Sequence, residues 1–404
     1  MKKNLLRLLV VALTVYSFSS CGEAPKESDL SIKEIIHKHY ADRDFTLGAS
    51  SRTSYLTTQR NLLDIWKKEF PHNTLENDFK QSGVYPEPGA QWNDTAYMAY
   101  IQIARENEQT IRAHCPISPQ ASRWICEDAR TGEEMEPVLI HYATGIYKDI
   151  EANKDVIKWM DVVNETIACN DITGNGYNSE CETDEVTYKR GEWFGPRAGT
   201  TNWENPWPKM GFVETEFEGE PYSIPRYIPL AFSLADEYAP SIKHVINQHG
   251  DKVDIPVWDN IFKMVRYLRS EGYRVDGVAF QAHIAEGWEK DPENKQELQQ
   301  IIDMAHALDL EFHISELDIK YDGEIKDLDA EQTAVVRAAQ AETIGAVVEL
   351  ILQNIDKGVV SLNFWTMADN RWEEGKTFCN LMEEDGSPLP SYHKVKELLL
   401  KYAK

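Results

Sequence analysis

Two glutamates in the sequence follow apolar runs that read as buried strands. The run Met160–Asn164 is followed by Glu165, and the stretch EFHISELDIKY places Glu316 and Asp318 at the end of another run. Burying a carboxylate without partners is costly, so a glutamate at the end of a core strand needs a reason. Two such carboxyl groups could provide a proton donor and a nucleophile or base, which is the pair that glycoside hydrolysis requires.

Short strand-like runs alternate with longer segments of helical pattern along the chain. This alternation favours a parallel sheet, and eight repeats predict closure into a (β/α)8 barrel, with a doubly wound open sheet as the alternative. No G-x-G-x-x-G or P-loop motif follows the first strand, which counts against nucleotide-binding open sheets. Strands are expected at Phe45–Ala49, Thr74–Glu76, Thr110–Ala113, Met160–Asn164, His244–Asn247, Val275–Gln281, Phe312–Glu316 and Val359–Trp365. Helices are expected at Leu56–Phe70, Thr95–Glu108, Pro137–Asn153, Ile228–Tyr238, Val257–Glu271, Lys295–Leu308, Glu331–Asn354 and Tyr392–Tyr402.

Polar residues gather at the expected carboxyl ends of these strands, where barrels of this type carry their active sites. Any one of them could be a hydrogen-bonded core group, but a set that converges on one rim indicates a site. The set is Glu76, Asn77, His114, Asn164, Glu165, Asn247, Gln281, His283, Glu316, Asp318 and Trp365.

Glu165 and Glu316, after the fourth and seventh strands, are the natural pair for glycoside hydrolysis. Neighbouring amides could bind sugar hydroxyls, an imidazole could hold one carboxylate ionised, and tryptophans could offer flat faces to sugar rings. These supporting side chains are Asn164, Gln281, His283, Trp365 and Trp372.

A long insertion, residues 166 to about 224, separates the fourth strand from its helix and is rich in Gly, Asn, Pro and Trp. Loops of this length in a compact domain are usually functional. The insertion could wall a binding cleft with Trp193, Trp203 and Trp207, together with the more distant Trp159. The alternative is a surface insertion that packs on itself.

Composition excludes several kinds of partner. The chain has 42 Lys and Arg against 67 Asp and Glu, a net charge of −25. This argues against nucleic-acid binding and against an anionic membrane surface, whereas a neutral glycan fits. No C-x-x-C or H-E-x-x-H pattern occurs, so a zinc site is not expected. Glycoside hydrolysis by two carboxyl groups is expected to need neither a metal nor an organic cofactor. Nothing indicates a partner protein, so a monomer is expected.

The first residues have the pattern of an export signal. Positive residues precede a short apolar run, Leu8–Val15, and small residues then lead to Cys21. This segment resembles a bacterial lipoprotein signal, with residues 1–20 removed and Cys21 lipidated; an ordinary secretory signal is the alternative. We expect a lipid anchor at the outer membrane or cell surface, a tether over 21–40 and the catalytic domain over 41–404. Periplasmic or secreted protein is the alternative location.

The remaining cysteines are five in number, so at least one thiol would stay unpaired. Cys169 and Cys181 could form a disulfide within the insertion. Connectivity cannot be read from spacing, and this pairing stays one of several.

Several segments resemble glycoside hydrolase family 10, the endo-β-1,4-xylanases. WMDVVNE is similar to the family's W-D-V-V-N-E, which implies that Glu165 is the acid/base. ISELDI is similar to I-T-E-L-D-I, which implies that Glu316 is the nucleophile. VDGVAFQAH resembles D-G-V-G-F-Q-x-H, which implies that Gln281 and His283 lie beside the nucleophile.

Further matches extend the resemblance over roughly residues 40–404. LENDFK resembles a glycone-binding segment, LNFWTMADNRW the aromatic segment after the last strand, and VINQHG, more weakly, the fifth-strand Asn segment. The resemblance implies a retaining mechanism, a covalent intermediate on Glu316 and carboxyl groups about 5–5.5 Å apart. The substrate-binding residues it implies are Glu76, Asn77, Lys80, His114, Asn164, Asn247, Gln281, His283, Trp365 and Trp372, with Asp318 supporting.

The third-strand segment departs from the family pattern. His114 is kept, but Ser118 and Pro119 stand where the family has a Trp and a second His, and Cys115 and Cys126 could stitch this altered loop. The sequence therefore predicts a retaining endo-β-1,4-xylanase acting on xylan. Two alternatives stay open: the same catalysis on another β-linked or decorated glycan, and a glycan-binding lipoprotein without turnover.

Overall fold

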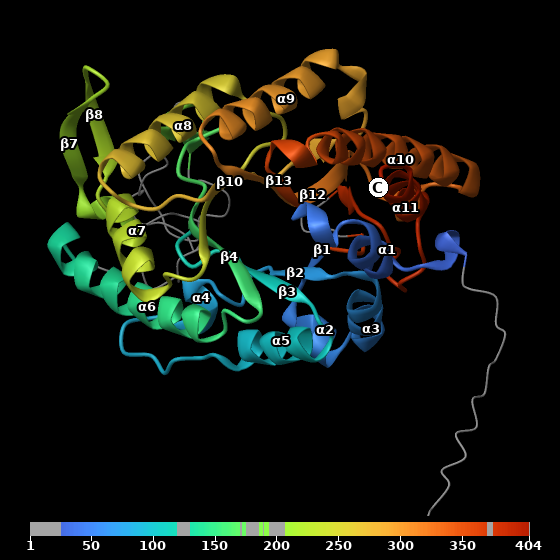
Figure 1. Ribbon diagram of the computed structural model, residues 1–404, viewed down its shortest axis with the longest axis horizontal. Coiled ribbons are helices and arrows are strands. Elements are labelled where there is room, and N and C mark those ends of the chain that lie inside the picture. The colour runs from blue at the N-terminus through green and yellow to red at the C-terminus, as the bar shows by residue number, and fades with distance from the viewer. Residues whose placement is uncertain are drawn as a thin grey trace, which may run out of the picture.

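Parallel strands close into a barrel in the part of the chain that the structure describes. The computed structural model describes residues 26–118, 130–169, 172–174, 186–188, 190–193, 207–369 and 375–403. Neighbouring strands follow the order β1, β2, β3, β4, β9, β10, β12, β13, and β13 pairs with β1 to complete the circle. The strands are β1 (Thr46–Ser51), β2 (His72–Leu75), β3 (Thr110–Ala113), β4 (Ile157–Asn164), β9 (Lys243–Gln248), β10 (Gly277–Phe280), β12 (Glu311–Tyr321) and β13 (Val359–Phe364). The expected (β/α)8 barrel is confirmed (Figure 1).

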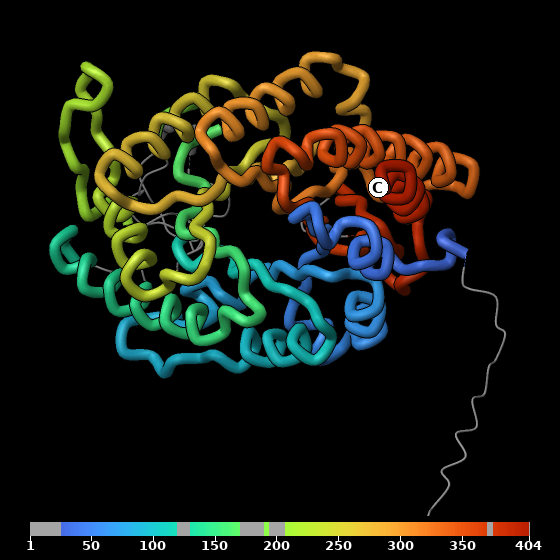
Figure 2. The backbone as a smooth tube through the Cα atoms, viewed as in Figure 1, coloured from blue at the N-terminus to red at the C-terminus, as the bar shows by residue number. Residues whose placement is uncertain are grey.

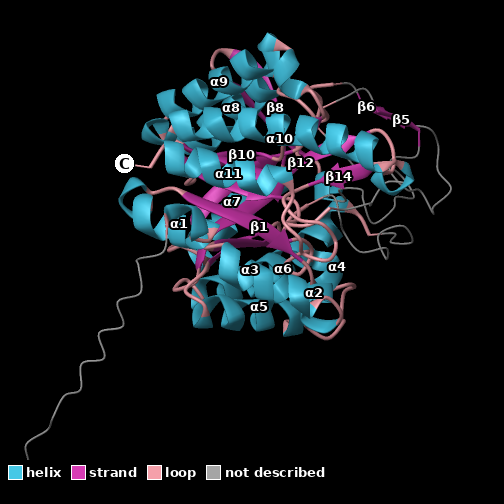
Figure 3. Ribbon diagram, turned by 90° about the vertical axis from the view of Figure 1, so that its right-hand side faces the viewer, coloured by secondary structure: helices cyan, strands magenta, loops and turns pink. Residues whose placement is uncertain are grey.

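Helices surround this barrel, as the side view in Figure 3 shows. Every helix expected from the sequence is present, although the segment expected as one helix over Leu56–Phe70 forms two, α2 and α3. None of the described helices has the length and apolar character needed to cross a membrane. The helices are α1 (Ile32–His39), α2 (Thr53–Thr57), α3 (Arg60–Glu69), α4 (Gln81–Val84), α5 (Thr95–Glu106), α6 (Gly132–Ala152), α7 (Tyr227–Tyr238), α8 (Ile255–Ser270), α9 (Pro292–Ala307), α10 (Ala330–Gln353) and α11 (Pro390–Lys401).

Helix α6 begins earlier than the expected start at Pro137 because a capping box precedes it. The Thr131 hydroxyl accepts a hydrogen bond from the Glu134 N–H, and the Glu134 carboxylate accepts one from the Thr131 N–H. These bonds satisfy backbone donors that a helix start leaves without partners. Pro137 therefore lies inside the helix rather than at its first turn.

The stretch expected as a tether over residues 21–40 contains a folded helix. Helix α1 buries Ile32, Ile35 and Ile36 in the main core, and Figure 2 shows this first helix beside the last one, α11. The Tyr40 hydroxyl donates a 2.7 Å hydrogen bond to the Leu399 carbonyl. The folded part of the chain therefore begins before residue 40. Its first helix is joined to its last helix by this contact.

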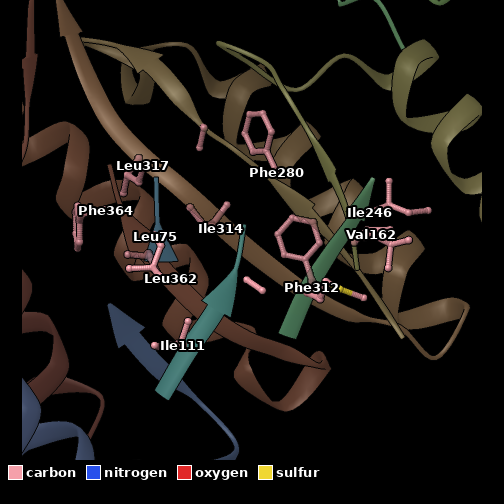
Figure 4. Packing of buried hydrophobic residues seen from close by; sticks show 14 of the residues in the cluster. Leu75, Ile111, Val162, Ile246, Phe280, Phe312, Ile314, Leu317, Leu362 and Phe364 are labelled. Carbon is pink, nitrogen blue, oxygen red and sulfur yellow. The ribbon is translucent and has the colours of Figure 1, made fainter. Parts of the chain in front are cut away.

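Alternating strand residues face two different environments. Ile111, Val162, Ile246 and Phe312 belong to the main hydrophobic core, and Figure 4 labels them, with Val162 of β4 close to Ile246 of β9. Side chains alternate between the faces of a strand, so the neighbours of these residues point into the barrel. The residues next to Ile246 include Asn247, which is fully buried there.

The described part of the insertion is mostly packed on itself or on the barrel. It contains β5 (Ile172–Gly174), β6 (Val186–Tyr188) and the hairpin of β7 (Phe212–Phe217) and β8 (Glu220–Pro225), which is seen at the left of Figure 1.

Outside the insertion, two short strands, β11 (His283–Ala285) and β14 (Thr377–Cys379), pair with β12.

The tryptophans of the insertion favour the self-packed interpretation. The Trp193 indole donates a 2.8 Å hydrogen bond to the Ser223 carbonyl of the hairpin, and Trp207 is only 1% exposed. Trp159 packs edge-on against His72 and His313 near the start of β4, far along the strand from Glu165. Trp203 lies outside the described residues. Of the two interpretations that the sequence left open, the described tryptophans favour the self-packed insertion over the cleft wall.

Candidate active site

The carboxyl ends of the barrel strands bring most of the predicted site residues together. Asn164 of β4 lies opposite Asn247 of β9 in the strand register. Glu165 follows directly with a left-handed φ of 53°, and its N–H donates to the Asn247 carbonyl at 3.0 Å. A non-glycine residue in this region is strained and often marks a functional position. The Glu316 N–H donates to the Gln281 carbonyl, also at 3.0 Å.

Three amide side chains connect the two glutamates. Gln281 Nε2 donates to Glu165 Oε1 at 3.0 Å and to Asn164 Oδ1 at 3.1 Å. Asn164 Nδ2 also donates to Glu165 Oε1, at 3.1 Å. Asn247 Nδ2 donates to Asn164 Oδ1 at 3.0 Å and to Glu316 Oε1 at 2.8 Å. Each carboxyl group therefore receives amide N–H donors, and one chain of hydrogen bonds runs from Glu165 to Glu316.

Imidazole groups surround the buried carboxyl of Glu316. His283 Nε2 lies 3.4 Å from Glu316 Oε2, and His114 Nε2 lies 3.8 Å from Glu316 Oε1. Burial opposes ionisation, but the charge of His114 and the hydrogen bond from His283 outweigh it and lower the pKa of Glu316 to about 2. Glu316 is therefore held as a carboxylate, the form a nucleophile needs.

Asp318 orients the His283 ring from the far side. His283 Nδ1 lies 2.9 Å from Asp318 Oδ1, and both side chains are buried. Burial opposes the imidazolium form, but the Asp318 carboxylate and Glu316 together raise the pKa of His283 to about 10. His283 is thus a fixed positive charge beside Glu316 at neutral pH.

A buried ion pair inside the barrel holds His114. Arg112 Nε donates to Asp161 Oδ2 at 3.0 Å, and Arg112 Nη2 forms a second bond to Asp161 Oδ1. The same Asp161 Oδ2 lies 2.9 Å from His114 Nδ1, and the Cys115 thiol lies 3.3 Å from His114 Nε2. Because Arg112 and Asp161 are both fully buried, the pair fixes the imidazole that faces Glu316.

The predicted glycone-binding residues follow β2. Glu76 is buried and accepts hydrogen bonds from Ser50 Oγ at 3.2 Å and from Arg52 Nε at 3.1 Å. Burial raises the pKa of Glu76, although Arg52 acts against this shift. Lys80 Nζ donates to Asn77 Oδ1 at 3.0 Å. This cluster offers carboxylate, amide and ammonium groups, which suit sugar hydroxyls.

Trp365 borders the same group of residues. Its ring centroid lies 5.3 Å from that of His114 and 6.4 Å from that of His283. Asn380 Nδ2 donates to the Trp365 carbonyl at 3.0 Å and so fixes the loop after β13. Trp372 lies outside the described residues.

One known family matches most of the chain. The family model described as Glycosyl hydrolase family 10 matches residues 36–190 and 220–398. The chain belongs to this family. The unmatched residues 191–219 fall within the long insertion, which therefore distinguishes this chain from the general family 10 pattern.

Named relatives in family 10 are distant in sequence. The chain is 24% identical over 343 residues to endo-1,4-beta-xylanase A of Caldicellulosiruptor saccharolyticus, which covers 82% of this chain and 87% of that protein. It is 23% identical over 373 residues to endo-1,4-beta-xylanase A of Caldicellulosiruptor sp. strain Rt8B.4, covering 90% of this chain but only 47% of that protein. The chain thus spans about half of that relative.

Solved structures of the same fold cover almost the whole chain. Xylanase 10B of Thermotoga petrophila RKU-1 in complex with xylobiose aligns with a TM-score of 0.71 at 21% identity, over 94% of this chain and 99% of that chain. Native xylanase 10B of Thermotoga maritima aligns with a TM-score of 0.70 at 22% identity, over 92% and 98%. At these identities the likeness supports the barrel fold.

The altered third-strand loop is only partly described. Ser118 is buried, whereas Pro119 and Cys126 lie outside the described residues. Cys115 is a free, buried thiol.

The disulfide considered for the insertion is not formed in this structure. Cys169 is a free thiol whose Sγ donates to the His249 carbonyl at 2.8 Å. Burial raises the pKa of Cys169 to about 12. Cys181, the possible partner named from the sequence, lies outside the described residues.

Several residues that support the predicted site were missing from the sequence prediction, among them Asp161, Arg112 and His249. Asp161 and Arg112 lie inside strand runs, and their pairing depends on two strands lying side by side. His249 lies within the weakly matching segment VINQHG, and its Nδ1 lies 2.7 Å from Gln281 Oε1. Its position two residues after Asn247 was the available signal.

The charge on His283 predicts a pH-dependent stability. The folded-state pKa of His283 is raised to about 10, so its contribution is fully present below pH 6.5 and lost as the pH rises toward 10. In that window one extra bound proton lowers the free energy of unfolding by at most about 1.4 kcal/mol per pH unit. Denaturant unfolding from pH 6.5 to 10 should therefore show a shallower slope for His283→Gln than for the wild type.

A histidine outside the site provides the control for this slope. His306 is exposed on α9, so His306→Gln should keep the wild-type slope. Equal slopes for His283→Gln and the wild type would contradict a retained proton on His283.

Proposed function

We propose that this protein is a retaining endo-β-1,4-xylanase that cleaves internal bonds of xylan. The observation that carries the proposal is the hydrogen-bonded chain from Glu165 to Glu316, together with the two histidines that keep Glu316 ionised. Family membership and the xylanase names of the relatives support the substrate. The xylobiose complex of the Thermotoga petrophila enzyme also supports it.

The proposed reaction has two displacements. In the first, the Glu316 carboxylate attacks the anomeric carbon, the bond to the leaving oxygen breaks, and Glu165 gives its proton to that oxygen. In the second, the Glu165 carboxylate takes a proton from water, whose oxygen displaces Glu316 from the sugar. The product keeps the β configuration, and both carboxyl groups return to their starting states.

Two alternative functions differ from this proposal, one in its substrate and the other in having no turnover. The unusual Ser118 and Pro119 favour a different or decorated β-linked glycan with the same mechanism. A glycan-binding protein without turnover is the other alternative, but binding alone would not need Glu316 to be kept ionised beside a second carboxyl group.

A glycan panel tests the proposal. Protein lacking residues 1–21 would be incubated with plain xylan, arabinoxylan, glucuronoxylan, mixed-linkage glucan and mannan, and reducing ends and product lengths measured. We expect xylan cleavage with oligosaccharides of mixed length at early times, abolished in Glu316→Gln. Activity on another glycan alone would keep the mechanism and change the assigned substrate. Binding without any turnover would contradict the proposal that the protein is an enzyme.

We also propose that the protein is exported and lipid-anchored through Cys21, as a monomer. The lipoprotein-like segment before Cys21 supports this location. In cells fed radiolabelled palmitate, the wild type should become labelled and Cys21→Ser should not. Label in Cys21→Ser, or none in the wild type, would contradict the anchor, and light scattering of the soluble form would test the monomer.

A further inference from the structure

His249 lies at the Glu165 end of the chain of hydrogen-bonded amide side chains that connects Glu165 with Glu316. Its Nδ1 lies 2.7 Å from Gln281 Oε1, and Gln281 Nε2 in turn contacts Glu165 and Asn164. A single amide thus stands between the His249 ring and the carboxyl group of Glu165. No step of the proposed mechanism uses His249 directly.

The donors and acceptors in this chain determine which atoms carry hydrogen. Gln281 Nε2 faces two oxygens, Glu165 Oε1 and Asn164 Oδ1, so it must be the amide nitrogen that donates to both. Gln281 Oε1 is then an acceptor. The His249 nitrogen 2.7 Å away must therefore be an Nδ1–H donor, because two acceptors would repel each other.

The other end of the chain shows the same arrangement. Ser315 Oγ donates to Asn247 Oδ1 at 2.7 Å, so that Asn247 Nδ2 faces Glu316. A donor at each end therefore sets the orientation of the amides between them. On the Glu165 side this donor is the imidazole of His249.

The backbone of His249 is held by the loop that follows Glu165. Cys169 Sγ donates to the His249 carbonyl at 2.8 Å, and Gln248 Nε2 donates to Cys169 Sγ at 3.2 Å and to the Ile167 carbonyl at 2.8 Å. These bonds tie the segment after Glu165 to the end of β9. The ring of His249 lies with its centroid 5.6 Å from that of His283.

We propose that His249 is a positioning residue for the acid/base Glu165, acting through the side-chain amide of Gln281. This inference rests on the proposed function of Glu165. Without the Nδ1–H donor, the Gln281 amide loses the bond that orients it and can rotate by 180°. Its oxygen would then face the Glu165 carboxyl and the Asn164 carbonyl, and Glu165 would lose an N–H donor.

A pair of substitutions separates the donor from the bulk of the ring. In His249→Asn the amide nitrogen can occupy the place of Nδ1 and donate to Gln281 Oε1, whereas His249→Leu has similar size and no donor. The measurement is kcat/KM, which reports the first displacement, for xylobiosides with two aglycones. Phenol is a poor leaving group that needs protonation, and dinitrophenol leaves without it.

The two variants should differ on one substrate only. For His249→Leu we expect kcat/KM on phenyl xylobioside to fall on the order of 10-fold to 100-fold, part of the general-acid contribution. On dinitrophenyl xylobioside the fall should be less than about 3-fold, because that leaving group needs no acid. His249→Asn should stay near the wild type on both.

Equal losses on both substrates, or equal losses for Asn and Leu, would overturn the role of His249. A wild type inactive on both substrates would instead reject the proposed function itself.

Nitrogen NMR of the wild-type histidines provides a readout that needs no variant. A proton on His249 Nδ1 is expected, and an unprotonated Nδ1 would overturn the proposal.

Discussion

The substitution Glu316→Gln is expected to reduce kcat on xylan by on the order of 10⁴-fold or more, the scale seen when a hydrolase loses its nucleophile. The side chain keeps its size, but the amide cannot attack the anomeric carbon. The neighbouring His114 and His283 stabilise the negative charge of the Glu316 carboxylate, and the amide of the variant has no such charge. Xylan binding, measured by calorimetry, should remain within a few-fold of the wild type.

A glutamate on the outer face of the protein provides the matched control. Glu397 is exposed on α11, so Glu397→Gln should keep wild-type kcat and binding. Substantial turnover by Glu316→Gln would contradict its assignment as the nucleophile.

Replacing the other carboxyl group should give a loss that depends on the leaving group. In Glu165→Ala the proton donor for the leaving oxygen is gone, so kcat on xylan should fall by about 10²-fold to 10⁴-fold. The kcat/KM for dinitrophenyl xylobioside should change little, because that leaving group departs without a proton. Steady-state kinetics on the two substrates make this comparison within a single variant.

Azide gives a second readout for Glu165→Ala. With the carboxylate absent, a small anion can reach the covalent intermediate, so azide should raise kcat and yield the β-configured glycosyl azide. If Glu165→Ala loses activity equally on both substrates and does not respond to azide, the acid/base role is wrong.

The barrel could be predicted from the sequence because its elements repeat the same local pattern. Strand runs such as Val359–Phe364 and helices such as α10 follow their own periodicity, and both were expected close to their observed bounds. Helix α1 was missed because its charged composition suggested a tether. Its Ile32, Ile35 and Ile36 nevertheless follow the three- and four-residue spacing of a buried helical face.

The site was predictable only where residues stand at strand ends. Asn164 and Glu165 were found in this way, at the end of β4. Glu316 was found as the end of an apolar run, although β12 continues to Tyr321 by pairing with β11 and β14. The contacts between these residues were not found, because Asn164 meets Asn247 only through the register of β4 with β9. Asp161 and Arg112 were hidden inside strand runs for the same reason, since their pairing depends on neighbouring strands.

The most direct test of the account is to trap the covalent intermediate. Wild-type protein would be treated with dinitrophenyl 2-deoxy-2-fluoro-β-xylobioside, which forms the glycosyl-enzyme quickly and releases it slowly, and then digested for mass spectrometry. A single added fluoroxylobiosyl group on the peptide that contains Glu316, absent in Glu316→Gln, is the predicted result. No adduct under conditions where xylan is cleaved, or an adduct on another carboxylate, would contradict a retaining mechanism through Glu316.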